Sequence, residues 1–197
     1  MSKTHDLILA SSSPRRKDFI SKLGLSFEII KPDADESVII GEKASDYVKR
    51  IAADKAHIVS ELRPDEVVLA ADTVVVCDDR IIGKPSSRDD ARKILRMLSG
   101  RTHEVMTAVC IMRGHEVSEI FESTRVTFAQ LSDELINTYV DSGECDDKSG
   151  AYAVQGIGSM LIEKVEGSVS SVVGLPVCQV RIALEKFGIF PRTVAAE

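Results

Sequence analysis

The segment that most constrains the fold is Val67–Cys77, in which nearly every residue is apolar and many are β-branched. A strand with one wet face alternates apolar and polar residues, whereas a continuous apolar run is typical of a strand covered on both faces. Such a strand needs other elements on each side of it, so the run predicts an α/β or α+β chain built on a mixed sheet.

Strands and helices alternate along the rest of the chain. Caps and hydrophobic periodicity predict, in order, a strand leading into a helix that Ser13 caps and Gly24 ends, a helix from Ser45 to about Leu62, a turn at 78–80, a helix from Ser87 to Ser99, antiparallel segments at 103–113 and 117–130, a helix capped by Ser132, a strand at 161–165 and a helix at 176–187. At 197 residues, the chain predicts one domain over 1–197, either as a single body or as two lobes that share a sheet.

Charge and cysteine spacing exclude several classes of function. The formal charge of -6, from 25 Lys and Arg against 31 Asp and Glu, leaves no broad basic surface for nucleic acid. The four cysteines lack zinc-ligand spacing, which predicts free thiols in a cytoplasmic protein. We expect no membrane association, because no signal-peptide pattern is present and no apolar run approaches the ~18 residues of a membrane span.

Three cations stand in the first turn of the first predicted helix. Arg15, Arg16 and Lys17 follow Ser13, a good N-cap, and Pro14, which suits the first helical position. A helix N-terminus already carries positive partial charge, so each added cation costs about 0.3–1 kcal/mol unless an anion binds there. Serine hydroxyls, backbone N–H groups and guanidinium groups together favour phosphate; the alternative is a solvated basic helix end.

Asp72 is the first of three polar residues at positions where packing alone would favour apolar ones. It lies with Thr73 inside the buried run, where an unpaired carboxylate would cost several kcal/mol. Asp72 must therefore face a cation, a metal ion or a polar cleft, or else be satisfied by backbone N–H groups at a strand end.

Lys55 and Lys84 are the other two such residues. Lys55 lies on the apolar stripe of its helix between Ile51 and Val59, so its side chain either snorkels to solvent or reaches into a cleft. Lys84 projects from a short loop that a glycine and a proline bracket. Basic side chains around one carboxylate suit phosphoryl or nucleotidyl transfer with a divalent metal.

A glycine-rich segment, residues 150–158, allows its backbone to approach a ligand closely, and the amide of Gln155 within it can pair with the edge of a base. The alternative is a plain glycine-rich turn between strands. The sequence contains no P-loop, no three-glycine dinucleotide fingerprint, no H-E-x-x-H and no G-x-S-x-G motif. These absences exclude the corresponding nucleotide-binding, zinc-protease and serine-hydrolase classes.

Six motifs follow one another along nearly the whole chain: L-A-S-S-S-P-R-R at 9–16, A-D-T-V-V at 71–75, G-K-P at 83–85, M-T-A-V at 106–109, G-A-Y-A-V-Q-G at 150–156 and V-G-L-P at 173–176. Together they resemble the Maf family of nucleoside triphosphate pyrophosphatases. The resemblance implies a Maf/ITPase-like fold, in which an elongated mixed sheet with flanking helices forms two lobes around a nucleotide-binding cleft.

The resemblance also implies a reaction, the hydrolysis of a nucleoside triphosphate to the monophosphate and pyrophosphate with Mg²⁺ or Mn²⁺. The catalytic carboxylate of the family falls on Asp72, and its other polar cleft positions fall on Ser11, Arg15, Arg16, Glu36, Lys55 and Lys84. We assign catalysis to Asp72, Lys55, Lys84 and Arg16, substrate binding to Ser11, Ser13, Arg15, Thr73 and Gln155, and metal binding to Asp72 and Glu36. Whether Asp72 acts as general base or as metal ligand stays open.

Three positions indicate the substrate. Arg15, Thr73 and Gln155 resemble the branch of the family specific for dTTP and UTP, whereas the 7-methyl-GTP branch tends to carry Trp, Gln and Glu there. The neutral amide of Gln155 can both donate to and accept from a pyrimidine edge. The alternatives are a 7-methyl-GTP pyrophosphatase and a non-catalytic nucleotide-binding regulator of cell division. A homodimer and a monomer are both compatible with the sequence.

Overall fold

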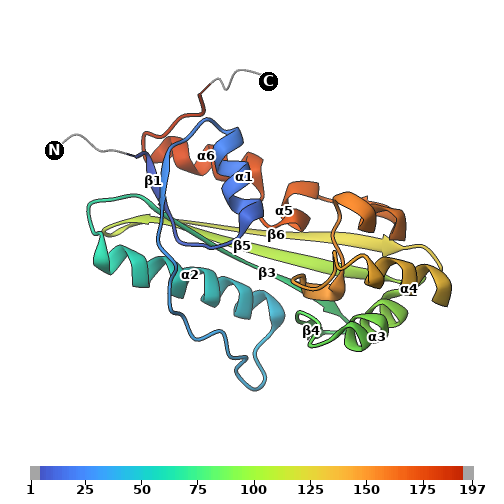
Figure 1. Ribbon diagram of the computed structural model, residues 1–197. Coiled ribbons are helices and arrows are strands. Elements are labelled where there is room, and N and C mark those ends of the chain that lie inside the picture. The colour runs from blue at the N-terminus through green and yellow to red at the C-terminus, as the bar shows by residue number, and fades with distance from the viewer. Residues whose placement is uncertain (1–4, 193–197) are drawn as a thin grey trace. The chain divides into compact units, whose positions relative to one another are not determined.

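The computed structural model, which describes residues 5–192, contains one mixed sheet with helices packed against it (Figure 1). The sheet has seven strands in the order β2-β1-β3-β5-β6-β7, and β4 pairs with β3. β1 runs parallel to both β2 and β3, whereas the β3–β4 and β6–β7 pairs are antiparallel. The predicted fold class, a mixed sheet with flanking helices, is confirmed.

The predicted strands and helices are found within a few residues of their expected bounds. The strands are β1 (Leu7–Leu9), β2 (Phe27–Ile29), β3 (Val68–Cys77), β4 (Arg80–Ile82), β5 (Thr102–Arg113), β6 (Glu116–Phe128) and β7 (Ile162–Glu166). The helices are α1 (Pro14–Lys22), α2 (Ala44–Leu62), α3 (Arg88–Leu98), α4 (Asp133–Asp141), α5 (Val169–Val173) and α6 (Val177–Lys186), with short 3₁₀ helices η1 (Ser149–Ala151) and η2 (Gly156–Leu161). Sequence patterns did not predict β2, β4, α5, η1 or η2.

Two of the four predicted serine caps act as expected. The hydroxyls of Ser87 and Ser132 accept hydrogen bonds from backbone N–H groups of the helices that follow them. Ser13 stands at the N-cap of α1, but its side chain makes no capping bond. The prediction that Ser45 caps α2 was wrong, because the carbonyl of Lys43 already accepts from the first N–H groups of the helix and so places Ser45 inside it.

The chain divides into two compact units. The first comprises residues up to Asp72, Thr107–Phe121 and residues from Gly174, and the second comprises Thr73–Met106 and Glu122–Val173. Strands β3, β5 and β6 each contribute residues to both units. The expectation that 1–197 forms a single domain stays a prediction.

In the first unit, successive residues of the buried strands point to opposite faces of the sheet. Leu7, Leu69 and Ile111 belong to a cluster with side chains of α1 and α6, whereas the neighbouring Ile8 and Val68 belong to a cluster with side chains of α2. Figure 1 shows α1 and α6 on one side of these strands and α2 on the other. The prediction that the central run is covered on both faces is thereby confirmed.

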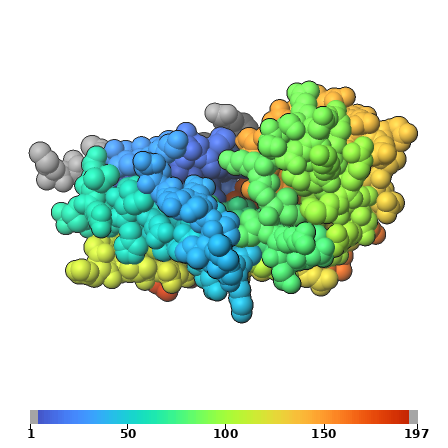
Figure 2. Space-filling view, turned by 90° about the horizontal axis from the view of Figure 1, so that it is seen from below, coloured from blue at the N-terminus to red at the C-terminus, as the bar shows by residue number. Residues whose placement is uncertain are grey.

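The connection from β2 to α2, residues 30–43, runs over the surface of the first unit beside α2 (Figure 2). Its apolar residues Val38, Ile39 and Ile40 are exposed. Arg50 of α2 holds the connection, because its Nε donates to Glu42 Oε1 at 2.7 Å and its Nη2 donates to the carbonyl of Ser37 at 3.1 Å. Arg50 therefore fixes the connection at Ser37, next to Glu36.

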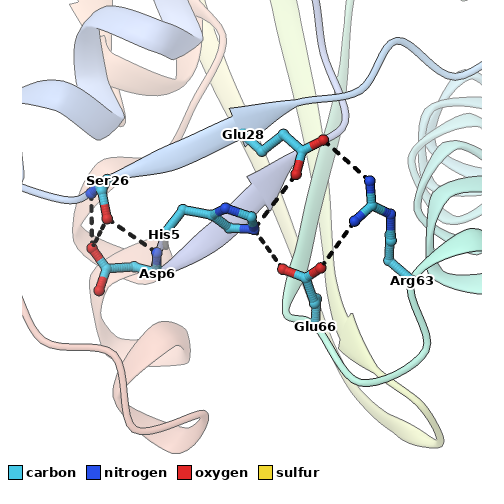
Figure 3. Close-up of polar contacts among 6 residues, drawn as sticks. All are labelled: His5, Asp6, Ser26, Glu28, Arg63 and Glu66. Carbon is cyan, nitrogen blue, oxygen red and sulfur yellow. Dashed lines mark hydrogen bonds and ion pairs between the residues drawn. The ribbon is translucent and has the colours of Figure 1, made fainter. Parts of the chain in front are cut away.

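A polar network fastens the edge of the same unit (Figure 3). His5, just before β1, has its Nε2 2.5 Å from Glu66 and 3.8 Å from Glu28 of β2. Arg63, at the end of α2, contacts both of these carboxylates. The network joins the edge strand β2 to the connection between α2 and β3, although partly exposed pairs of this kind add little to stability one by one.

The second unit has its own core, formed by α3, α4 and the strand segments beneath them. His103 of β5 is buried there, with Nε2 2.8 Å from the hydroxyl of Tyr152 and its ring edge-on to Phe128 and Tyr152. Burial lowers the pKa of His103 from 6.5 to about 4. Its Nδ1 has no hydrogen-bond partner in the described part of the chain. His103 is therefore neutral near pH 7.

The thiols agree with the sequence prediction. All four cysteines are free, and Cys77, Cys110 and Cys145 are buried while Cys178 is exposed. Within residues 5–192, no helix combines the length and the apolar character needed to cross a membrane.

We expect acid to destabilise the protein through His103. Its pKa in the folded state is below that of an unfolded histidine, so the unfolded chain takes up the proton first. The free energy of unfolding should therefore fall as pH drops from about 6.5 to about 4, by up to ~3 kcal/mol. Urea unfolding of His103→Gln should show a smaller fall, while His115→Gln, which removes an exposed histidine, should follow wild type. An equal fall in all three proteins would refute the assignment.

Candidate active site

Lys55 and Asp72, two charged residues that the sequence places among apolar ones, contact each other. Lys55 Nζ donates to Asp72 Oδ1 at 2.9 Å, and each residue is only 9% exposed. Of the alternatives that the sequence left open for Asp72, the structure shows a cation, the ammonium group of Lys55. Lys55 reaches inward from α2 to β3 and does not snorkel to solvent.

Glu36 approaches the same lysine from the surface connection. Its Oε1 is 2.8 Å from Lys55 Nζ, and its side chain is 58% exposed. Tyr47 of α2 donates from its hydroxyl to the carbonyl of Glu36 at 2.9 Å, which holds this part of the connection against the helix. Glu36 and Asp72 therefore meet at one ammonium group from two different elements.

Tyr47 was not predicted as part of the site. It is buried, and both its burial and the charges of Asp72 and Glu36 raise the pKa of its hydroxyl. The available signal was its spacing, because Tyr47 lies eight residues before Lys55 on the same helical stripe.

The loop between β1 and α1 brings Ser11 and Arg16 together. Arg16 Nη1 donates to Ser11 Oγ at 3.2 Å, and Arg16 Nε donates to the carbonyl of Gly174 at 2.9 Å. Ser11 is buried and also accepts from the backbone N–H of Ser13 at 3.2 Å. Arg16 is therefore packed into the loop, so at this residue the helix start is not simply a solvated basic end.

The charges of the loop and of the carboxylates act on one another. Burial lowers the pKa of Arg16, the negative charges of Asp72 and Glu36 oppose that effect, and the positive charge of Arg15 reinforces it. Arg16 stays protonated at any ordinary pH. The first unit thus gathers two guanidinium groups, one ammonium and two carboxylates within electrostatic range, a combination suited to a polyphosphate.

The other predicted residues belong to the second unit. Thr73 follows Asp72 on β3 and is partly buried, whereas Lys84 and Gln155 are exposed. The backbone N–H of Gly150 donates to the carbonyl of Gly83 at 3.1 Å, which ties the loop of Lys84 to the glycine-rich segment that carries Gln155.

The two carboxylates could also contribute to a metal site. Among residues 5–192, no three His, Cys, Asp or Glu side chains are grouped so as to hold a metal ion. Mg²⁺ is commonly bound by one or two protein carboxylates and completes its shell with phosphate oxygens and water. Asp72 and Glu36, both of which already bind one cationic group, fit an ion that is held jointly by the protein and an anionic ligand.

Comparison with known proteins assigns the chain to a family. The profile described as Maf-like protein matches residues 6–187. The chain belongs to the Maf family. Similar proteins named dTTP/UTP pyrophosphatase come from Hahella chejuensis (48% identical, covering 93% of this chain and 92% of the relative), Anaeromyxobacter dehalogenans (49%, 94% and 95%) and Bacillus cereus (43%, 93% and 96%). The resemblance drawn from the six motifs is confirmed.

In this Maf chain, we expect Lys55→Met to be more destabilising than Asp72→Asn. Loss of the lysine leaves the buried Asp72 charge without its hydrogen-bonded cation, which should cost about 3 kcal/mol. Asp72→Asn leaves Lys55 paired with Glu36 and should cost about 1 kcal/mol. Urea unfolding measures both, with Lys49→Met, an exposed lysine of the same helix, as control. Equal losses in Lys55→Met and Lys49→Met would mean that the pair does not matter for folding.

Proposed function

We propose that this Maf-family chain hydrolyses dTTP and UTP to the nucleoside monophosphate and pyrophosphate. The observation that carries the proposal is the meeting of Lys55, Asp72 and Glu36 beside the Arg16 loop, in a chain 43–49% identical to relatives named dTTP/UTP pyrophosphatase. A carboxylate at a buried strand, paired to a lysine that can be drawn toward phosphate, favours catalysis over simple nucleotide binding.

In the proposed reaction, water attacks the α-phosphorus. A new P–O bond forms, the P–O bond to the bridging α–β oxygen breaks, and pyrophosphate leaves with the bonding electrons. The attacking water gives up its proton, for which Asp72 is the candidate acceptor. Arg16, Lys55 and Lys84 neutralise charge that develops on the phosphate oxygens, and Ser11 and Ser13 donate hydrogen bonds to them.

Divalent metal is part of the proposal. Asp72 and Glu36 would hold Mg²⁺ or Mn²⁺, which when bound would neutralise phosphate charge and polarise the reacting phosphate. In the structure, the ammonium group of Lys55 contacts both carboxylates and so neutralises part of their negative charge. Asp72 as base and Asp72 as metal ligand are both consistent with this pairing.

Base selection is proposed for Arg15, Thr73 and Gln155. A neutral amide at Gln155 can donate to a pyrimidine carbonyl and accept from its ring N–H. Gln155 is exposed and forms no hydrogen bond with the described part of the chain, so its amide is available to a ligand. We propose a cytoplasmic enzyme acting on free nucleotides; a homodimer and a monomer are both compatible with that role.

The function is tested by pyrophosphate release with Mg²⁺ across UTP, dTTP, CTP, ATP, GTP and 7-methyl-GTP. We expect UTP and dTTP to be preferred, with the monophosphate as second product. Asp72→Asn should lower kcat by at least ~10³-fold while the fold melts near its normal temperature. Preference for 7-methyl-GTP would keep the reaction but overturn the base assignment. No turnover with any nucleotide would favour a binding protein.

Metal removal gives a separate prediction. Treatment with EDTA should abolish pyrophosphate release, and added Mg²⁺ or Mn²⁺ should restore it. Glu36→Gln should raise the Mg²⁺ concentration needed for half-maximal activity by about tenfold, because one proposed ligand loses its charge. Asp33→Asn, which changes an exposed carboxylate of the same surface connection, is the control. Full activity in EDTA would contradict the proposed metal.

A further inference from the structure

The backbone just after Gln155 is held by a carboxylate distant in sequence. Glu144, in the turn after α4, accepts from the N–H of Ile157 through Oε1 at 3.0 Å and from the N–H of Gly158 through Oε2 at 2.7 Å. Both donors lie in the first turn of η2, directly after Gln155. Two charge-assisted hydrogen bonds from backbone N–H groups to one carboxylate fix both the position and the direction of this turn.

The glycines of the segment fit this carboxylate closely. A Cβ on Gly156 would lie 2.2 Å from Glu144 Oε1, and its φ of +80° is itself unfavourable for other residues. A Cβ on Gly158 would lie 2.3 Å from the carbonyl oxygen of Ala153. In the structure, the space that a side chain would need at each glycine is therefore taken by other atoms of the protein. The sequence had instead suggested that these glycines let a ligand approach the backbone.

Glu144 also takes over a role that an N-cap side chain usually performs. Gln155 is the residue that caps η2, and a side chain at that position ordinarily accepts from the second or third N–H of the helix. Here Glu144 accepts from those N–H groups, and the Gln155 side chain makes no capping bond. The amide of Gln155 is consequently left for a ligand.

Glu144 is itself held in place. Lys148 Nζ donates to the carbonyl of Glu144 at 2.9 Å, within a turn anchored by the buried Cys145. From the end of α4, the hydroxyl of Tyr139 accepts from the N–H of Ala153 at 3.1 Å and so fastens the other side of the segment. These contacts fix the turn that carries the Glu144 carboxylate.

We propose that Glu144 is a positioning residue for base selection, which presents the amide of Gln155 to the pyrimidine. The proposal rests on the proposed function, because it assigns Gln155 to the base. Glu144 touches neither phosphate nor base in this role. Its loss should weaken binding of the preferred nucleotide and its discrimination more than it slows the chemical step.

The test compares Glu144→Ala, Glu144→Gln and wild type by steady-state kinetics with UTP and ATP. Glu144→Ala should raise the KM for UTP about tenfold, change kcat less than about threefold and reduce the ratio of kcat/KM for UTP over ATP. Glu144→Gln keeps one side-chain oxygen as acceptor and should recover part of that ratio. Glu163→Gln, which changes an exposed carboxylate on β7, should match wild type.

Amide hydrogen exchange supplies a readout that does not need activity. The N–H groups of Ile157 and Gly158 should exchange faster in Glu144→Ala than in wild type. If wild type is active and Glu144→Ala keeps the same UTP-to-ATP ratio of kcat/KM, the role of Glu144 is overturned and the proposed function stands. Unchanged exchange at these two amides in Glu144→Ala would have the same meaning. A wild-type protein that turns over no nucleotide would overturn the proposed function itself.

Discussion

The burial of the Asp72 carboxylate is the constraint on which the rest of the site depends. A charge in the middle of a strand covered on both faces needs a partner that satisfies it, because the cost of desolvation otherwise reaches several kcal/mol. Lys55 supplies that cation from α2 at 2.9 Å. The ion pair therefore joins α2 to β3 at a position on the helix stripe where an apolar residue would otherwise be expected.

Further charged groups surround the Lys55–Asp72 pair. Lys55 also binds Glu36, which the surface connection delivers to it, and Tyr47 holds that connection through the carbonyl of the same residue. Arg16 packs beside Ser11 and Gly174, and the negative charges of both carboxylates raise its pKa against the effect of burial. This set of cations and carboxylates suits a polyphosphate that binds together with a divalent ion. The phosphates could then pair with the basic side chains, and the ion with the carboxylates, in place of the contacts these groups make with one another.

Much of this protein was predictable from local patterns. The apolar run over Val67–Cys77 predicted β3, and serines before helical periodicity predicted α3 and α4 with their caps. The three-residue strands β2 and β4 were missed because so short a segment carries no periodicity and becomes a strand only by pairing with a longer neighbour. The cap at Ser45 was mistaken for another reason: α2 begins before Ser45, with Lys43 at its N-cap and no side-chain capping bond.

The sequence by itself determined that Asp72 and Lys55 are anomalous, because a charged residue in an apolar pattern is visible without any structure. It also determined the family, through motifs that follow in order along the chain. Only the tertiary structure decided that the two residues satisfy each other, that Glu36 and Tyr47 join them, and that Glu144 holds the turn after Gln155. The physical reason is that these contacts join residues 11 to 19 positions apart, and side chains so far apart in sequence meet only after strands pair and helices pack.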